Sequence, residues 1–181
     1  MKKFKLTSEF IVDISGVKLF RIKALIEFGN VKAGDLGGYI EKEENLSHMG
    51  DAWVSDDARI SGNAQVFGNA QVFGNAQVFG DAWVFGNARV FGNARVSGDA
   101  QVFGDARVSG DKDYAYAHGF GSCNRTTTFF RLKDGDVGVR CGCFYGTLAQ
   151  FRDKVCETHG ETKKAQEYLM LADLMEIRFK N

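Results

Sequence analysis

The chain has 181 residues, which is enough for one or two small domains. Lys plus Arg and Asp plus Glu each number 23, so the formal net charge is zero, which argues against a broad electrostatic surface for nucleic acid or an anionic membrane. Glycine is abundant at 22 residues and proline is absent. This composition excludes collagen-like and proline-rich disordered chains, and favours a fold in which nearly every backbone N–H donates to a ladder.

The sequence contains no apolar run of about eighteen residues, and its basic start, MKKFKLTSEF, has no apolar core. We therefore expect no membrane span and no signal peptide, and we predict a cytoplasmic location, in the host cell if a phage encodes the protein. The four cysteines are then expected to be free thiols, because disulfides are rare in a reducing compartment.

Residues 1–49 are expected to form an irregular N-terminal cap. Within them, VKLFRIKALIEF alternates apolar and polar residues, which is typical of one or two strands. The following KAGDLGGYIEKEENLS is rich in turn-forming residues. We expect this segment to cover the open end of the element that follows it.

Residues 50–111 repeat every six positions without insertion or deletion, in hexads such as GNAQVF and GDARVS. Side chains of a strand alternate between two faces, so the alanine and the Val or Ile of each hexad point the same way. Gly followed by Asn or Asp tolerates a left-handed backbone and marks a corner. Each hexad therefore predicts a short strand and a turn, and the period excludes a helix.

The hexads resemble the hexapeptide-repeat family, whose motif is an aliphatic residue, two or three variable residues and a small residue. The resemblance implies a left-handed parallel β-helix of triangular section, with three hexads per coil. This chain departs from the family after the aliphatic position, where it has Phe or Ser instead of Gly. Two alternatives stay open: a right-handed β-helix like that of bacterial polymer-forming cytoskeletal proteins, and a disordered low-complexity tract.

A coil of three hexads sorts the outward residues onto three faces, and only one of these is uncharged and fully aromatic. An exposed surface of this kind favours association, so we expect a second subunit, the C-terminal segment or a partner to cover it. The family resemblance implies a homotrimer. The alternative is that the phenylalanines tuck into the corners as core. The predicted interface residues are Phe67, Trp83, Phe85 and Phe103.

Residues 112–125 leave the six-residue period and are expected to be a linker. Residues 126–181 are expected to form a small C-terminal α+β domain. Its first part, TTTFFRLK and VGVRCGCF on either side of KDGD, predicts a β-hairpin.

Two helices are predicted after this hairpin. Thr147 is placed to cap a helix over residues 148–158, which Gly160 ends. The segment from residue 161 to residue 179 has the apolar spacing of a second helix. Its predicted buried stripe is Tyr168, Leu169, Leu171, Ala172 and Met175.

Enzymatic candidates are few. Hexapeptide acyltransferases, which use acetyl-CoA, usually employ a histidine as general base. The repeats contain no histidine and no looped-out segment, so the candidate bases are His48 in the cap and His118 in the linker. The alternative for each is a solvated loop histidine.

Two further groups are candidates for binding. Cys141 and Cys143 are expected on one strand face, and Cys156 and His159 one helical turn apart, as weak zinc ligands. Their spacing is not that of a usual zinc knuckle and cysteine is common core material, so we expect no metal and no cofactor.

A glycine turn is followed by residues that can hold a phosphate or carboxylate, the alternative being an ordinary polar turn. These residues are Ser122, Asn124, Arg125 and Thr126.

The segment RIKAL…FGNVKAGDLGGYIEKEENLS resembles the start of bacteriophage and prophage hexapeptide proteins, which are often labelled acyltransferases. That label is inherited from the fold and does not establish activity. We therefore expect a non-catalytic phage or prophage binding protein on a trimeric β-helix, with counter-defence by binding a host protein or a small nucleotide as its role. The alternatives are an acyltransferase and a structural virion or filament component.

Overall fold

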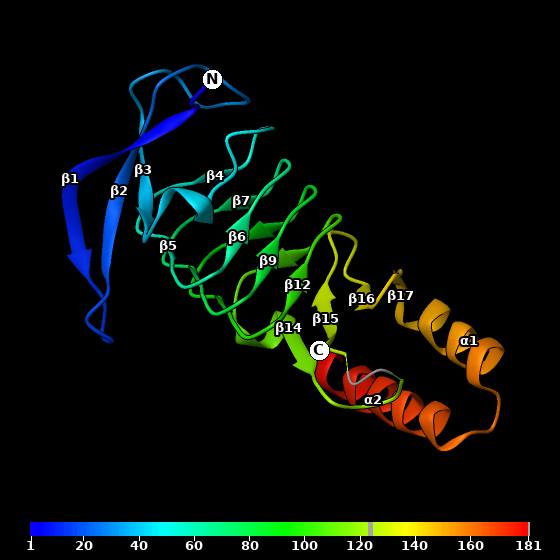
Figure 1. The fold of residues 1–181 in the computed structure, drawn as a ribbon. Helices are drawn as coiled ribbons and strands as arrows, with labels where there is room; N and C mark the ends of the chain where they lie inside the picture. Colours follow the sequence, from blue (N-terminus) through cyan, green and yellow to red (C-terminus); the bar gives the residue numbers. More distant parts are fainter. Residues whose placement is uncertain (123–124, 181) are drawn as a thin grey trace.

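The computed structural model describes residues 1–122 and 125–180 (Figure 1). Strands β1 (Phe4–Val12) and β2 (Lys18–Ala24) form an antiparallel hairpin at the N-terminal end. Strand β3 (Leu36–Ile40) pairs antiparallel with β2 and parallel with a strand of the repeat. A short 3-10 helix, η1 (Glu43–Asn45), follows. The N-terminal cap is therefore joined to the repeat by a continuous sheet.

The hexads form a three-sided parallel β-solenoid. One sheet has the order β13-β10-β7-β4, a second β12-β9-β6, and the third continues from β3 through β5-β8-β11. Paired residues lie one coil apart, as in Gln65 with Trp83 and Trp83 with Gln101, which confirms the predicted three hexads per coil. The strands are β4 (Trp53–Val54), β5 (Arg59–Ile60), β6 (Gln65–Val66), β7 (Gln71–Val72), β8 (Gln77–Val78), β9 (Trp83–Val84), β10 (Arg89–Val90), β11 (Arg95–Val96), β12 (Gln101–Val102) and β13 (Arg107–Val108).

Alanine and Val or Ile side chains fill the interior of the solenoid, and every one of them in the hexads is fully buried. The phenylalanines are only half-buried and stack outside this core. The ring centroids of Phe67 and Phe85 are 4.8 Å apart, and those of Phe85 and Phe103 are 4.7 Å apart. The alternative in which these rings form the core is therefore wrong, because the Ala and Val side chains already fill the interior.

The corners have the left-handed backbone that the Gly-Asn and Gly-Asp pairs predict. Gly80, for example, has φ +72°, and nearly every hexad places a glycine of positive φ at this point. Asp56 stands where the other hexads have glycine and is itself left-handed, with φ +55°. Its carboxylate accepts a hydrogen bond of 2.9 Å from the backbone N–H of Gly74 in the next coil.

Both ends of the solenoid are closed by side chains that replace a missing coil. In an inner coil the carbonyl of Ala70 accepts from the N–H of Trp53, whereas the equivalent carbonyl of Ala52 accepts from Nζ of Lys3 at 2.7 Å. Asn45 Nδ2 donates in the same way to the carbonyl of Ala64 at 2.8 Å. At the other end, acceptors take the place of carbonyls: Ser97 N–H donates to Tyr114 Oη, Gln101 N–H to Thr128 Oγ1, and Ser109 N–H to Asp113 Oδ2.

The C-terminal unit begins with a 3-10 turn, η2 (Asp111–Asp113), and an antiparallel sheet of order β14-β15-β16-β17. Part of the expected linker is thus a strand, β14, because its residues pair in register with β15 from Tyr114 with Phe130 to Ala117 with Thr127. The predicted hairpin is the central pair of this sheet. The strands are β14 (Tyr114–Ala117), β15 (Thr127–Arg131), β16 (Val137–Cys141) and β17 (Phe144–Thr147).

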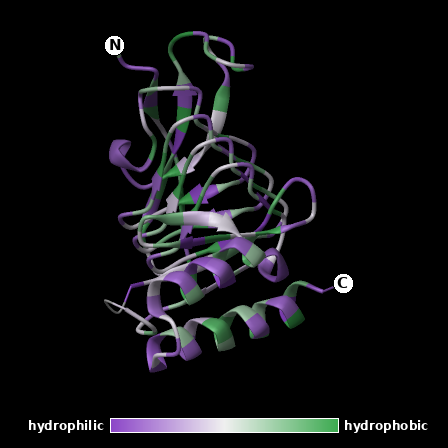
Figure 2. Ribbon diagram, turned by 90° about the vertical axis from the view of Figure 1, so that its right-hand side faces the viewer, coloured by the Kyte–Doolittle hydropathy of each residue, from purple (hydrophilic) through white to green (hydrophobic). Residues whose placement is uncertain are grey.

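Helices α1 (Leu148–His159) and α2 (Lys163–Phe179) complete the chain and lie together at the end opposite the N-terminus (Figure 2). Thr147 caps α1 as predicted, in a capping box with Gln150, and Gly160 follows its last residue. Among the described residues, neither helix is long and apolar enough to cross a bilayer. Of the predicted stripe on α2, Tyr168, Ala172 and Met175 are buried, while Leu169 and Leu171 are half-buried.

Candidate functional site

The surface that we call the aromatic face lies on the β6-β9-β12 side of the solenoid and contains Gln65, Phe67, Trp83, Phe85, Gln101 and Phe103. Trp83 is 42% exposed and meets the ring of Phe67 edge-on at 6.0 Å. The stacked phenylalanines run alongside it. All four predicted interface residues therefore lie on one side of the solenoid, with Trp83 open to solvent in the single chain.

The C-terminal unit contacts one end of the aromatic face and leaves the rest uncovered. Tyr145 packs on Phe103 with ring centroids 4.2 Å apart. Arg140 lies over the Phe103 ring at 5.1 Å and donates from Nε to Gln101 Oε1 at 3.1 Å. These contacts fix the last coil against the C-terminal sheet.

At its other end the aromatic face opens into a groove of about 680 Å³ beside η1, lined in part by Glu43, His48, Phe67 and Trp83. The imidazole of His48 stacks on Phe4, and its Nδ1 accepts from the backbone N–H of Lys3 at 3.2 Å. Its Nε2 is buried 3.7 Å from the Glu43 carboxylate and has no hydrogen-bond partner among the described residues. Neither nitrogen is open to a substrate in this arrangement.

The other candidate base, His118, is exposed at the far end of the solenoid. Its Nδ1 lies 2.9 Å from Thr126 Oγ1 and 3.9 Å from the carboxylate of Asp99, in the last coil. His48 lies beside the first coil, next to the groove. The structure therefore does not bring the two histidines together.

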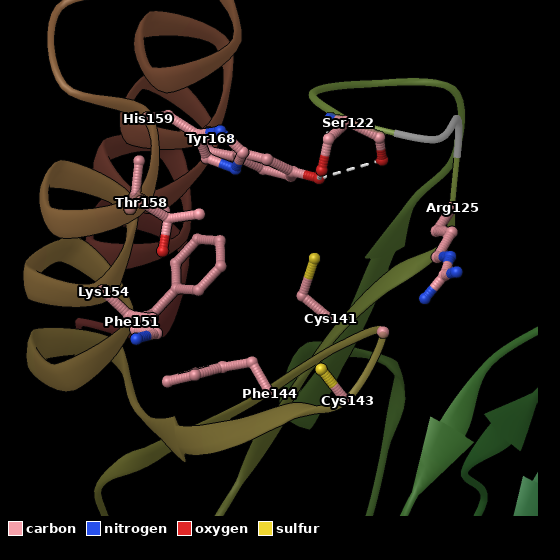
Figure 3. A pocket seen from close by; sticks show the side chains of 12 residues that line it. Ser122, Arg125, Cys141, Cys143, Phe144, Phe151, Lys154, Thr158, His159 and Tyr168 are labelled. Carbon is pink, nitrogen blue, oxygen red and sulfur yellow. Dashed lines mark hydrogen bonds between the residues drawn. The ribbon is translucent and has the colours of Figure 1, made fainter.

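A cavity of about 270 Å³ lies within the C-terminal unit, between the sheet and the helices (Figure 3). The β16–β17 turn forms one wall, α1 and α2 form another, and Ser122 and Arg125 line a further side. We call this the C-terminal cavity. Its lining side chains are Ser122, Arg125, Cys141, Cys143, Phe144, Phe151, Lys154, Val155, Thr158, His159 and Tyr168, together with the backbone of Gly142.

Tyr168 attaches the segment before β15 to α2 at the edge of this cavity. Its Oη accepts from the backbone N–H of Ser122 at 3.0 Å and lies 3.3 Å from Ser122 Oγ (Figure 3). Burial raises the pKa of the Tyr168 hydroxyl above its usual value. Gly121 lies so close to the Tyr168 ring that a Cβ there would be 2.0 Å from it, so no larger residue fits.

The predicted anion-binding residues are divided by the structure. Ser122 and Arg125 line the C-terminal cavity, whereas Thr126 does not and pairs with His118. Asn124 lies outside the described residues.

The cysteines and His159 do not form a zinc site. Cys141, Cys143 and His159 line the C-terminal cavity, while Cys156 is exposed on α1 outside it. Within residues 1–122 and 125–180, no group of three or more His, Cys, Asp or Glu residues is arranged to hold a metal ion. Cys143 is in a two-residue turn rather than on the strand face expected from the sequence, because β16 ends at Cys141 and Gly142 has φ +58°.

The α1 wall of the C-terminal cavity was not predicted from the sequence. Phe151, Lys154, Val155 and Thr158 are spaced three and four apart, so they share one face of α1. That spacing is visible in the sequence, but it equally predicts a helix face that packs against the sheet. The space between this face and Tyr168 depends on how the two helices meet.

The fold and the repeat define a β-solenoid repeat protein. A model of the protein family described as YdcK Beta solenoid repeat matches the chain over residues 58–74, 82–98, 88–102 and 100–111. These segments all lie in the hexad region, so the similarity concerns the solenoid. A search of curated proteins found no match.

Proposed function

We propose that this chain is a non-catalytic binding protein whose solenoid is a rigid scaffold that self-associates through the aromatic face. The observation that carries the proposal is the exposed Trp83 beside a stack of three phenylalanines, on a face without a charged strand residue. The other two faces present arginines at the equivalent strand positions, for example Arg89 and Arg95. Burial of apolar surface is the main favourable term in association, so the aromatic face is the side that another copy of the chain would cover.

A closed trimer is the arrangement that the resemblance to hexapeptide proteins implies, and a three-fold axis would bring three aromatic faces together. End-to-end stacking into a filament is opposed by the structure of the two ends. Lys3 and Asn45 already occupy carbonyls of the first coil, and the C-terminal unit covers the last. A counter-defence role against a host protein or a nucleotide signal stays a prediction of the phage resemblance.

Replacement of Trp83 by glutamate tests the self-association. We expect the native chain to sediment as a closed oligomer at micromolar concentration and Trp83→Glu to sediment as a monomer, because three carboxylates would be buried together. The matched control is Gln77→Glu, which introduces the same charge at the same hexad position on another face and leaves the oligomer intact.

Analytical ultracentrifugation with native mass spectrometry separates the outcomes. A native chain that stays monomeric at about 100 μM, a concentration at which a stable interface would be filled, contradicts the proposal. Open-ended polymers also contradict it and favour the structural filament instead.

A further inference from the structure

We propose that the C-terminal cavity binds a small organic anion whose body is a single aromatic ring. The cavity lies wholly within one chain, so this inference does not depend on self-association through the aromatic face. It extends the sequence-based expectation of an anion near Ser122 and Arg125 to a defined shape and chemistry.

The size of the cavity sets the size of the ligand. An apolar cavity of about 150 Å³ holds benzene. The C-terminal cavity measures about 270 Å³, which leaves room for one ring and one carboxylate or phosphate group.

Aromatic side chains from β17 and the two helices line this space. The ring centroids of Phe144 and Phe151 are 5.6 Å apart, and those of Phe151 and Tyr168 are 5.7 Å apart at 82°. The His159 and Tyr168 rings are stacked, with centroids 5.8 Å apart. Edge-to-face and offset contacts of this kind are the ones that a further aromatic ring can join, so a flat apolar ligand fits this wall.

The charge of the lining favours an anion. Arg125 and Lys154 are exposed cations on opposite sides of the mouth, and the lining contains no carboxylate (Figure 3). Lys154 has a partner outside the lining, since its Nζ lies 2.8 Å from the carboxylate of Glu157. Arg125 forms no salt bridge with any residue that the structure describes.

Glycine at position 142 makes room for the arginine. A Cβ there would lie 2.9 Å from the Nη1 atom of Arg125, so the guanidinium rests directly on the β16–β17 turn. A planar guanidinium donates two parallel hydrogen bonds to a carboxylate or phosphate. Ser122 and Thr158 add hydroxyl groups to the lining of the cavity.

Calorimetry with four probes tests the ligand class. We expect phenyl phosphate and benzoate to bind with Kd of about 0.1–1 mM, as ring-sized ligands do. Benzyl alcohol lacks the anion and inorganic phosphate lacks the ring, so each should bind at least about tenfold more weakly. Phenyl phosphate tighter than benzoate identifies a phosphorylated ligand, and the reverse order identifies a carboxylate.

Thiol labelling locates the binding. Cys143 lines the C-terminal cavity and Cys156 is exposed outside it, so bound phenyl phosphate should slow alkylation of Cys143 and leave Cys156 unchanged. Arg125→Gln should weaken phenyl phosphate about tenfold, since a charged hydrogen bond is lost. Lys164→Gln removes an exposed cation of α2 outside the cavity and serves as the control.

Absence of binding by both ring anions up to about 10 mM overturns the inference, because that concentration is well above the expected Kd of about 0.1–1 mM. Equal affinity for benzyl alcohol, or unchanged affinity in Arg125→Gln, also overturns it. The variant Trp83→Glu should bind phenyl phosphate as tightly as the native chain, so a monomeric protein does not count against the cavity.

Discussion

The corner glycines are the residues on which the solenoid depends most directly. Gly80 combines φ +72° with a close neighbour, because a Cβ there would lie 3.0 Å from the backbone nitrogen of Gly98 in the next coil. A left-handed backbone costs an ordinary residue about 1–2 kcal/mol, and the close contact adds to it. The corner therefore penalises any side chain twice.

Gly80→Ala should accordingly lower the free energy of unfolding by at least about 1–2 kcal/mol. The control is Gly110→Ala, since Gly110 has extended backbone at φ −164° and nothing lies within 4 Å of its Cβ position. Urea denaturation followed by circular dichroism measures both. Equal loss of stability in the two variants would contradict the role of the corner.

Lys3 is an unusual residue because its ammonium group is buried at the N-terminal end of the solenoid. It is 1% exposed, lies 4.6 Å from the centre of the Phe28 ring, and donates to the carbonyls of Gly50 and Ala52. Burial lowers the pKa of Lys3 to about 8, and the nearby charge of Asp51 partly opposes that shift.

The depressed pKa of Lys3 predicts that stability rises with pH. Between about pH 8 and pH 10.5 the unfolded chain keeps the Lys3 proton that the folded chain has released, so folding is favoured as pH increases. The gain approaches about 3 kcal/mol over the whole pKa difference, at 1.4 kcal/mol per pKa unit, and about 2 kcal/mol of it falls between pH 8 and pH 10. Denaturation of the native chain and Lys3→Met at pH 8 and pH 10 measures it, and parallel pH dependence of the two proteins would refute it.

At the scale of elements, the solenoid is stable only because other elements satisfy its open ends. Strand β14 supplies the clearest case. The hydroxyl of Tyr114 accepts from the N–H of Ser97 at 3.2 Å and donates to its carbonyl at 3.1 Å, where a further coil would otherwise pair. Burial raises the pKa of the Tyr114 hydroxyl, which keeps it protonated and able to donate.

Tyr114→Phe should therefore destabilise the chain by about 1–3 kcal/mol, since it removes both hydrogen bonds to the half-buried backbone of Ser97. Tyr116, two residues along the same strand and largely exposed, gives the matched control Tyr116→Phe. Hydrogen exchange should show the loss first in the last coil. Unchanged protection of Ser97 would mean that water replaces the hydroxyl.

The elements also separate what the sequence predicts from what it does not. The two helices follow from local signals, Thr147 before α1 and the apolar spacing of α2. The strand β14 was missed because YAYA looks like part of a linker until its partner Thr127–Phe130 is known. Cys143 was misplaced for a similar reason, since the end of β16 is set by pairing with β15.

For the whole molecule, the repeat makes the solenoid predictable and the remainder less so. Each hexad applies the same local rule, so the three faces and their residues, Trp83 among them, could be sorted from the sequence alone. The C-terminal cavity has no such period. Lys154 comes from a segment distant from Ser122 and Arg125, and the three residues line one cavity only because two helices pack on a sheet.

Because every coil contains three hexads, the number of hexads sets both the length of the solenoid and the orientation of the C-terminal unit about its axis. Because strands pair at the same register in every coil, an inserted set of three hexads would lengthen the axis by about 4.8 Å and leave the two ends in the same orientation. A single inserted hexad would instead rotate the C-terminal unit by a third of a revolution about the axis and break the run of rings. Small-angle scattering distinguishes the two insertions. Natural relatives are thus expected to differ in length by whole coils. The orientation of the C-terminal cavity relative to the β1–β2 hairpin is then expected to be the same in all of them.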